Sequence, residues 1–181
     1  IGYFKDLDRS VLYCTYGNNK DMKVLMRNDH MWINLPSSAR AIRITPMQRL
    51  LGQASVGDIA KISFSRDYKC TVEENDSTEL KLLLIAKSEG ATYQKIILYV
   101  NSQTYKPVKS EFFFLSGKHF KTAYYTRYSK INETDIITQI KIIDEIKHGC
   151  YSIIESFDYK NRNFPAKYFN VRYLPEFRIV D

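Results

Sequence analysis

Glycine and proline, which interrupt helices and strands, and cysteine, which can form disulfides, are scarce in this chain. Its 181 residues include seven glycines, five prolines and three cysteines. Cys14, Cys70 and Cys150 are far apart and odd in number, which excludes a dense disulfide framework and leaves at most one bridge with a free thiol. Because free cysteines usually pack as small apolar side chains, we expect them to be buried and unpaired.

Long apolar runs are missing as well. No stretch approaches the roughly 20 apolar residues of a membrane-spanning helix, so we expect a soluble protein. No internal repeat, low-complexity tract or linker divides the chain, and we expect one domain over residues 1–181. The chain starts at Ile1 inside a strand-like pattern, which predicts that an N-terminal piece precedes it and makes the lack of a signal peptide uninformative.

Signatures of catalysis and cofactor binding are not found. The three histidines, His30, His119 and His148, have no metal-ligand spacing with a Cys, Asp or Glu partner. There is no G-x-S-x-G elbow, P-loop or G-x-G-x-x-G. Adjacent carboxylates such as Asp144 and Glu145 point to opposite faces of a strand. We expect no metal, no cofactor and no enzyme, although a Cys–His pair formed only in three dimensions stays open.

What the chain does contain is aromatic residues and positive charge. Fourteen Tyr and ten Phe favour strands, and 27 Lys plus Arg against 20 Asp plus Glu give a net charge of +7. That charge is compatible with nucleic acid, anionic headgroups or an acidic partner protein. The basic and aromatic stretch 118–128 resembles a stacking platform for single-stranded nucleic acid. Strand alternation explains it more simply, with one more apolar face and one mixed face.

The apolar pattern predicts a mainly β fold. Three strands precede residue 36 and seven follow residue 63, at 10–16, 22–27, 30–35, 64–72, 80–87, 94–101, 108–115, 121–128, 136–146 and 150–157. Turn-like clusters separate them, at 17–21, 28–29, 74–77, 88–90, 116–117 and 148–149. Because no helix intervenes between the later strands, the pattern favours an antiparallel barrel or a strongly curved sheet.

Residues 36–63 interrupt the strands. Thr45 as N-cap, Pro46 at the first helical position and Gly52 at the end predict a short helix. A second helical turn is predicted from residue 55 or 56 to 62, with Asp58 near its positive end. Near the C-terminus we predict a helical turn over 164–169 and an extended segment over 170–174.

Three stretches carry a resemblance to a known family. Residues 31–58 contain W-x-x-L-P from Trp32, R-x-x-R-I from Arg40, and Gly57-Asp58. With residues 107–113 and 116–118 and the closing segment 164–174, they resemble the outer-membrane lipoprotein-sorting proteins of the LolA-like superfamily. The matches span nearly the whole chain, but the signal sequence, long N-terminal helix and first strands of that family are expected to be missing.

The resemblance implies a fold and a function. It implies a curved antiparallel half-barrel of about eleven strands in the full-length protein, with short helices forming a lid over an apolar cavity. It also implies a non-enzymatic periplasmic carrier of lipids or lipoprotein acyl chains, which receives cargo from an inner-membrane exporter and delivers it to an outer-membrane acceptor. The alternative is an interaction or sensor domain on the same scaffold, which binds an exporter or another envelope protein.

Such a carrier needs an apolar cavity and a movable lid. The residues predicted for the cavity mouth and lid are Trp32, Ile42, Ile44, Met47, Leu50 and Leu51. Those predicted to line the concave sheet are Phe64, Leu83, Ile97, Tyr99, Phe113 and Tyr125, with ordinary core packing as the alternative. Arg40 and Arg43 flank the lid and are expected to bind lid carbonyls or a lipid phosphate, or simply to be solvated. Asp58 is expected to cap a lid helix or to pair with one of these arginines.

Overall fold

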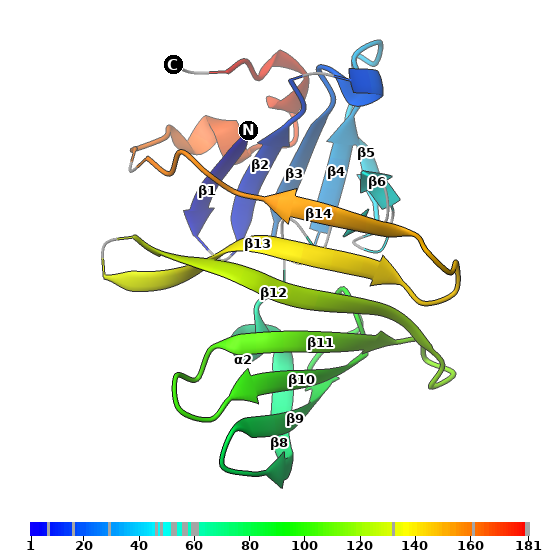
Figure 1. Cartoon of the computed structure of the whole chain (residues 1–181). Helices are drawn as coiled ribbons and strands as arrows, with labels where there is room; N and C mark the ends of the chain where they lie inside the picture. The colour runs from blue at the N-terminus through cyan, green and yellow to red at the C-terminus, as the bar shows by residue number, and fades with distance from the viewer. Residues whose placement is uncertain are drawn as a thin grey trace.

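The computed structural model shows a mainly β protein built from two antiparallel sheets and a small hairpin. It describes residues 1–6, 8–15, 17–28, 30–45, 47, 49–51, 54–55, 58, 62–131, 133–160 and 162–179. The strands of the two sheets run in crossing directions, and neither sheet closes into a barrel (Figure 1). The predicted curved antiparallel architecture is therefore confirmed, with the strands divided between two sheets.

The first sheet is a five-stranded meander in which each strand pairs with the next one in the chain. Its strands are β1 (Gly2–Asp6), β2 (Arg9–Tyr13), β3 (Lys23–Arg27), β4 (His30–Asn34) and β5 (Ile42–Ile44), with the 3-10 turn η1 (Gly17–Asn19) between β2 and β3. Asn28 has φ of 53°, in the left-handed region that asparagine tolerates in turns. The predicted turn at residue 28 is thus confirmed between β3 and β4.

The segment after β5 forms a hairpin where we predicted a helix. Strands β6 (Arg49–Leu51) and β7 (Ala54–Ser55) pair antiparallel with each other, whereas the predicted capping residues Pro46 and Gly52 lie outside the described residues. Ala54 and Ser55 are both buried. A helix of one or two turns is marginal by itself, so the burial of β7 decides the local structure.

The second sheet is a seven-stranded meander that begins with a helical turn. The turn α2 (Phe64–Asp67) replaces the first residues of a predicted strand, and the sheet follows as β8 (Tyr68–Asn75), β9 (Glu79–Ala86), β10 (Lys95–Asn101), β11 (Pro107–Phe113), β12 (His119–Ile131), β13 (Thr134–Asp144) and β14 (Tyr151–Glu155). Gly117 and Gly149 have φ of 83° and 79°, which confirms the turns predicted at these glycines.

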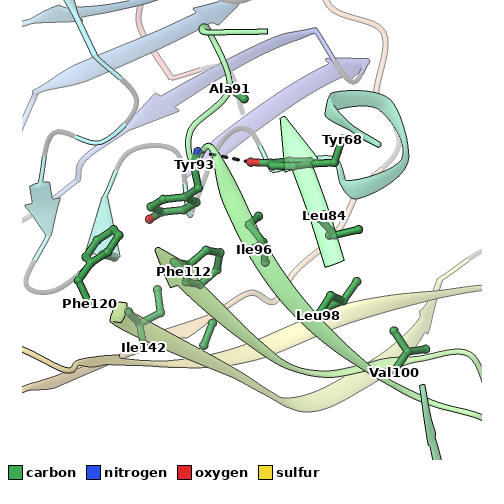
Figure 2. Packing of buried hydrophobic residues seen from close by; sticks show 12 residues of the cluster. Tyr68, Leu84, Ala91, Tyr93, Ile96, Leu98, Val100, Phe112, Phe120 and Ile142 are labelled. Carbon is green, nitrogen blue, oxygen red and sulfur yellow. Dashed lines mark hydrogen bonds between the residues drawn. The ribbon is translucent and has the colours of Figure 1, made fainter. Parts of the chain in front are cut away.

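The main core lies on one face of the seven-stranded sheet, which we call the inner face. Leu84, Ile96 and Phe112 come from adjacent strands in register and point to the same side (Figure 2). They pack with Tyr68 and Tyr93, and the Tyr68 hydroxyl accepts a hydrogen bond from the Tyr93 backbone N–H at 3.4 Å. Ala54 of β7 belongs to the same cluster, so the β6–β7 hairpin covers this face.

The five-stranded sheet is buried on both faces. One face carries Val24, Met26 and Met31 in a cluster that Ile44 joins. The other face packs against the C-terminal segment, which contains η2 (Ala166–Phe169) and η3 (Leu174–Glu176) and lies beside β1–β3 (Figure 1). The helical turn predicted at 164–169 is confirmed. The extended segment predicted at 170–174 is wrong, because the Asn170 side chain accepts the Arg172 N–H and starts a turn.

Arg66 of α2 connects the two sheets. Its guanidinium lies 2.7 Å from the Asp8 carboxylate, beside the β1–β2 turn, and 2.6 Å from Asp67. Together with Asn28 and Lys87 these side chains line a small polar pocket of about 330 Å³. The mostly polar surroundings suit a solvated junction rather than an acyl-chain site.

All three cysteines are free thiols. Cys14 and Cys150 are half-buried, whereas Cys70 is exposed on the edge strand β8. The expectation of a buried Cys70 is wrong, because that side of the edge strand has no covering element in the described part of the chain.

Candidate functional site

An apolar groove lies between the end of the first sheet and one end of the second. Its volume is about 1080 Å³. It is lined by the segment after β5, the β9–β10 loop and the β11–β12 turn, with Arg43, Ile44, Thr45, Met47, Glu89, Gly90, Ala91, Thr92, Tyr93, Gln94, Phe113, Phe114, Leu115 and Ser116. Ligand pockets commonly measure about 300–1000 Å³, so the groove has room for a lipid-sized molecule.

Aromatic rings form the wall of the groove that adjoins the main core. The rings of Phe114 and Phe120 stack with centroids 3.9 Å apart, and the Phe120 ring lies 5.9 Å from that of Tyr93. Tyr93 in turn packs against Phe112 at 4.3 Å. Because Tyr93 also lines the groove, this wall continues directly into the main core.

A buried polar cluster formed by Ser55, Asp58, Tyr93 and Lys121 adjoins this wall. The Lys121 ammonium on β12 donates to Asp58 Oδ2 at 2.7 Å and to the Tyr93 hydroxyl at 2.8 Å. The Tyr93 hydroxyl donates to Asp58 Oδ1 at 2.5 Å. The side chains of Lys121 and Asp58 are each only 3% exposed, so the ion pair is shielded from water.

Ser55 and Asp58 also bind each other, each through its backbone N–H and its side-chain oxygen. The Ser55 N–H donates to Asp58 Oδ2 at 2.8 Å, and the Asp58 N–H donates to Ser55 Oγ at 3.3 Å. This reciprocal pattern is a capping box at the start of a helical turn. It agrees with the predicted capping role of Asp58, and the remainder of the predicted helix lies outside the described residues except for Ile62, which is not helical.

Burial keeps Tyr93 protonated in this cluster. Desolvation, followed by the nearby Asp58 carboxylate, raises the pKa of Tyr93 well above its ordinary value. The Tyr93 hydroxyl is protonated at neutral pH in any case, and the raised pKa keeps it a hydrogen-bond donor toward a carboxylate into the alkaline range. The adjacent Thr92 hydroxyl is buried, has no hydrogen-bond partner among the described residues and belongs to the lining of the groove.

The described residues contain neither a metal-binding cluster nor a membrane-spanning helix. No three His, Cys, Asp or Glu side chains come together there as they would around a metal ion. Within the same residues no helix has the length and apolar character needed to cross a bilayer.

The fold and the sequence together relate the chain to known proteins. A LolA superfamily protein from Nitrosomonas europaea has 32% sequence identity and a TM-score of 0.85, covering 95% of this chain and 80% of that one. The chain belongs to the LolA superfamily. A family model described as "Uncharacterized protein" also matches residues 6–176. A search of the curated proteins finds no match.

More distant structures share the LolA fold of this chain. A DUF1329 family protein from Desulfovibrio piger has a TM-score of 0.75 at 18% identity and covers 92% of this chain and 76% of that one. A putative outer membrane lipoprotein-sorting protein domain from Vibrio parahaemolyticus has a TM-score of 0.74 at 15% identity. The match covers 92% of this chain and 77% of that one. At these low sequence identities, the two structures show only that the fold is similar.

Only some of the predicted lid residues of this LolA superfamily chain meet at the groove. Ile44, Met47 and Arg43 line it, whereas Ile42 on the same strand is 55% exposed and is not part of the lining. Leu50 and Leu51 lie in β6, and their side chains are outside the described part of the chain. Whether these residues bind a ligand stays a prediction.

Trp32 lies away from the groove. It is on the face of the five-stranded sheet that packs against the C-terminal segment. The centroids of its ring and the His30 ring are 5.9 Å apart. The expected position at the cavity mouth is therefore wrong. Both faces of this sheet are covered, so alternation alone does not tell which neighbour a side chain meets.

The two predicted arginines have different surroundings. Arg43 donates from Nη2 to His30 Nδ1 at 2.7 Å, while Arg40 is exposed and its carbonyl accepts a hydrogen bond from the Ser38 hydroxyl. The salt-bridge partner of Asp58 is Lys121, so the expected pairing of Asp58 with an arginine is wrong. A lysine 63 residues further along the chain satisfies this buried carboxylate instead.

Among the residues predicted for the concave sheet, Phe64 and Tyr125 pack on the inner face. Their rings lie 6.4 Å apart, and the Tyr125 hydroxyl lies 2.8 Å from Ser110 Oγ. The prediction that this face also carries Leu83, Ile97 and Tyr99 is wrong.

The register places these three side chains on the opposite, outer face. Leu83 pairs with Ile97, while their neighbours Leu84 and Ile96 belong to the core. Phe113 has the same outward parity but reaches the groove at the end of β11. The polar residues of β9 and β10 all share this outer parity, namely Glu79, Lys81, Lys95 and Asn101. Alternation in the sequence therefore marked the buried face, and the prediction overlooked it.

Sequence reasoning did not find Ser55, Tyr93 and Lys121. Lys121 alternates with Ala123 and Tyr125, and this mixed face of β12 is the one that is buried. A lysine on an inner face normally requires a charged partner, and no local spacing identifies Asp58 as that partner.

Proposed function

We propose that this chain is a LolA-like carrier that holds a lipid or lipoprotein acyl chain in the apolar groove. The observation that carries the proposal is the groove of about 1080 Å³, with Ile44, Met47, Phe114 and Leu115 on its walls, in a protein of the LolA superfamily. Burial of a methylene group contributes roughly 0.8 kcal/mol, so a chain of several methylenes would be retained.

The groove is open to one side, which suits a carrier. Leu115 is 88% exposed, Met47 is 41% exposed and Phe114 is 36% exposed, so the acyl chain would meet side chains that now face water. A carrier must also release its cargo, and a groove at the surface permits transfer without unfolding of the main core. We infer a single functional unit over residues 1–181 in the periplasm, between an inner-membrane exporter and an outer-membrane acceptor.

The first test is native mass spectrometry of the full-length protein from its own envelope, followed by organic extraction. We expect a phospholipid or acylated peptide in near-stoichiometric amount. An empty protein that also takes up no fluorescent fatty acid would overturn the carrier proposal.

A pair of variants tests the groove itself. Leu115→Asp places a charge on the apolar wall and is expected to weaken binding of a fluorescent fatty acid about tenfold or more, since burial of a leucine contributes roughly 1.5–3 kcal/mol. Phe157→Asp is the matched control, because Phe157 is 78% exposed and is not part of the lining. Equal affinity of the two variants would contradict the assignment of the groove.

The second candidate function is a module that binds an exporter or another envelope protein. It is favoured by apolar side chains on the outer face of the edge strand β14, where Tyr151 and Ile153 are 57% and 53% exposed. Exposed apolar patches commonly mark protein contacts. Loss of partner binding after Ile153→Asp, with fatty-acid uptake intact, would support this candidate.

A further inference from the structure

We propose that Lys121 and Tyr93 form a binding site for a carboxylate, that the side chain of Asp58 occupies this site in the cargo-free protein, and that the head group of a fatty acid replaces it. The proposal deepens the proposed function and rests on it for the acyl chain, which would lie in the groove. It assigns a chemical class to the cargo, namely a single-chain lipid with a free carboxylate.

The Asp58 carboxylate is held as a bound ligand would be. It accepts hydrogen bonds from the Lys121 ammonium at 2.7 Å, from the Tyr93 hydroxyl at 2.5 Å and from the Ser55 backbone N–H at 2.8 Å. A cation combined with neutral donors is the usual receptor for a carboxylate. Lys121 and Tyr93 belong to the second sheet and its β9–β10 loop, so two of the three donors do not belong to the segment that carries Asp58.

The ion pair itself is an unusual choice for a core. Lys121 lies on the inner face beside Phe112 and Phe120, and both charged side chains are 3% exposed. Desolvation of two ions commonly offsets most of their attraction, so apolar side chains of similar size would stabilise the fold as well or better. A buried pair of this kind is better explained by a role in recognition than by stability.

The position of the cluster gives an acyl carboxylate access to it. Tyr93 belongs to both the cluster and the lining of the groove. The neighbouring Thr92 hydroxyl is buried there and has no hydrogen-bond partner in the part of the chain that the structure describes. Across β12 and β13, Lys121 pairs in register with Asp144, whose carboxylate accepts two backbone N–H groups. Replacement of Asp58 by one ligand carboxylate leaves the local charge unchanged, whereas a doubly charged phosphate would add negative charge beside Asp144.

A short carboxylate tests the site without the groove. Asp58→Ala removes the internal carboxylate, and we expect acetate to raise the thermal midpoint of this variant relative to chloride at equal ionic strength. Acetate should not raise the midpoint of the wild type or of the double variant Asp58→Ala/Lys121→Met. An equal response of the single and double variants would overturn the carboxylate site.

Two long-chain ligands, dodecanoate and dodecanol, test whether the carboxylate site and the groove bind the same molecule. We expect Asp58→Ala to prefer dodecanoate over dodecanol by about tenfold more than the double variant does, because a hydrogen bond to a charged group is worth about one factor of ten. Failure of both ligands to bind any variant would overturn the acyl groove, and equal binding of the two ligands to Asp58→Ala would overturn the carboxylate site alone.

A second variant covers the case in which Asp58→Ala does not fold. Asp58→Asn keeps the shape of the side chain and removes its charge, so dodecanoate competes with a neutral amide for Lys121. Its preference for dodecanoate over dodecanol should exceed that of the wild type. A preference no greater than the wild type's would overturn the proposal.

Discussion

Lys121 carries a positive charge into the core, and its effect on stability depends on Asp58. We expect Lys121→Met to lower the free energy of unfolding by about 3–5 kcal/mol, because it leaves the Asp58 carboxylate buried without its cation. Urea denaturation followed by circular dichroism measures the change.

The control for this substitution is Lys141→Met on β13. Lys141 lies over the Tyr151 ring at 4.8 Å on the outer face, and its loss should change the free energy of unfolding by about 0.5 kcal/mol or less. The double variant Asp58→Asn/Lys121→Met should recover part of the lost stability. Similar effects of both lysine substitutions would contradict the importance of the buried pair.

Tyr125 contributes a hydroxyl to the same inner face. Tyr125→Phe deletes the hydrogen bond between this hydroxyl and Ser110 Oγ and leaves the fully buried Ser110 without that partner. We expect a loss of about 1–2 kcal/mol in the free energy of unfolding. The neighbouring Tyr124 points outward and is 39% exposed, so Tyr124→Phe should have little effect in the same urea titration.

At the scale of elements, the C-terminal segment holds the five-stranded sheet. The Phe177 ring is fully buried. Its centroid lies 5.2 Å from the ring centroid of Tyr3 and 5.3 Å from that of Tyr168. The buried Lys23 of β3 donates to the Pro175 carbonyl at 2.7 Å, which fixes the segment across the sheet. Desolvation is the main cause of the lowered pKa of Lys23.

Removal of the Phe177 ring should uncouple this segment from the sheet. We expect Phe177→Ala to cost about 3–5 kcal/mol in the free energy of unfolding and to increase hydrogen exchange over β1 and β2. Phe4→Ala serves as control, because Phe4 is 56% exposed on the same sheet. Unchanged exchange in β1 and β2 would mean that the sheet does not depend on the C-terminal cover.

At the scale of the whole molecule, buried tyrosines make the fold sensitive to alkali. Desolvation raises the pKa of Tyr128 to about 12 and also raises the pKa values of Tyr68, Tyr93 and Tyr125 above the ordinary tyrosine value. Unfolded tyrosines titrate near about 10, so between pH 10 and the folded pKa values the unfolded state binds fewer protons. The stabilisation is fully present below pH 10 and is lost as the pH rises above it.

Alkaline titration checks this expectation. Tyrosinate absorbance from these four side chains should rise together with the loss of the circular dichroism signal. Stability that stays constant from pH 10 to pH 12 would contradict the effect of burial on these four hydroxyls.

Local sequence signals predicted the strands and turns well. Alternating or continuous apolar runs bounded by turn residues defined ten strands, and residues such as Gly117 and Gly149 marked turns because few residues tolerate a positive φ. They did not predict the short strand β5, the β6–β7 hairpin or α2. Short-range preferences are weak there, and contacts of Ala54 and Phe64 with the core decide the hairpin and α2.

The sequence by itself determined the class of fold, the order of the strands and membership of a family, because these depend on patterns between close neighbours and on motifs along the chain. Only the tertiary structure decided where Trp32 points and which cation meets Asp58. The five-stranded sheet has a core cluster on each face, so alternation along β4 does not tell which neighbour a side chain meets. A charge pair between residues 63 apart exists only after two sheets and a hairpin have packed together.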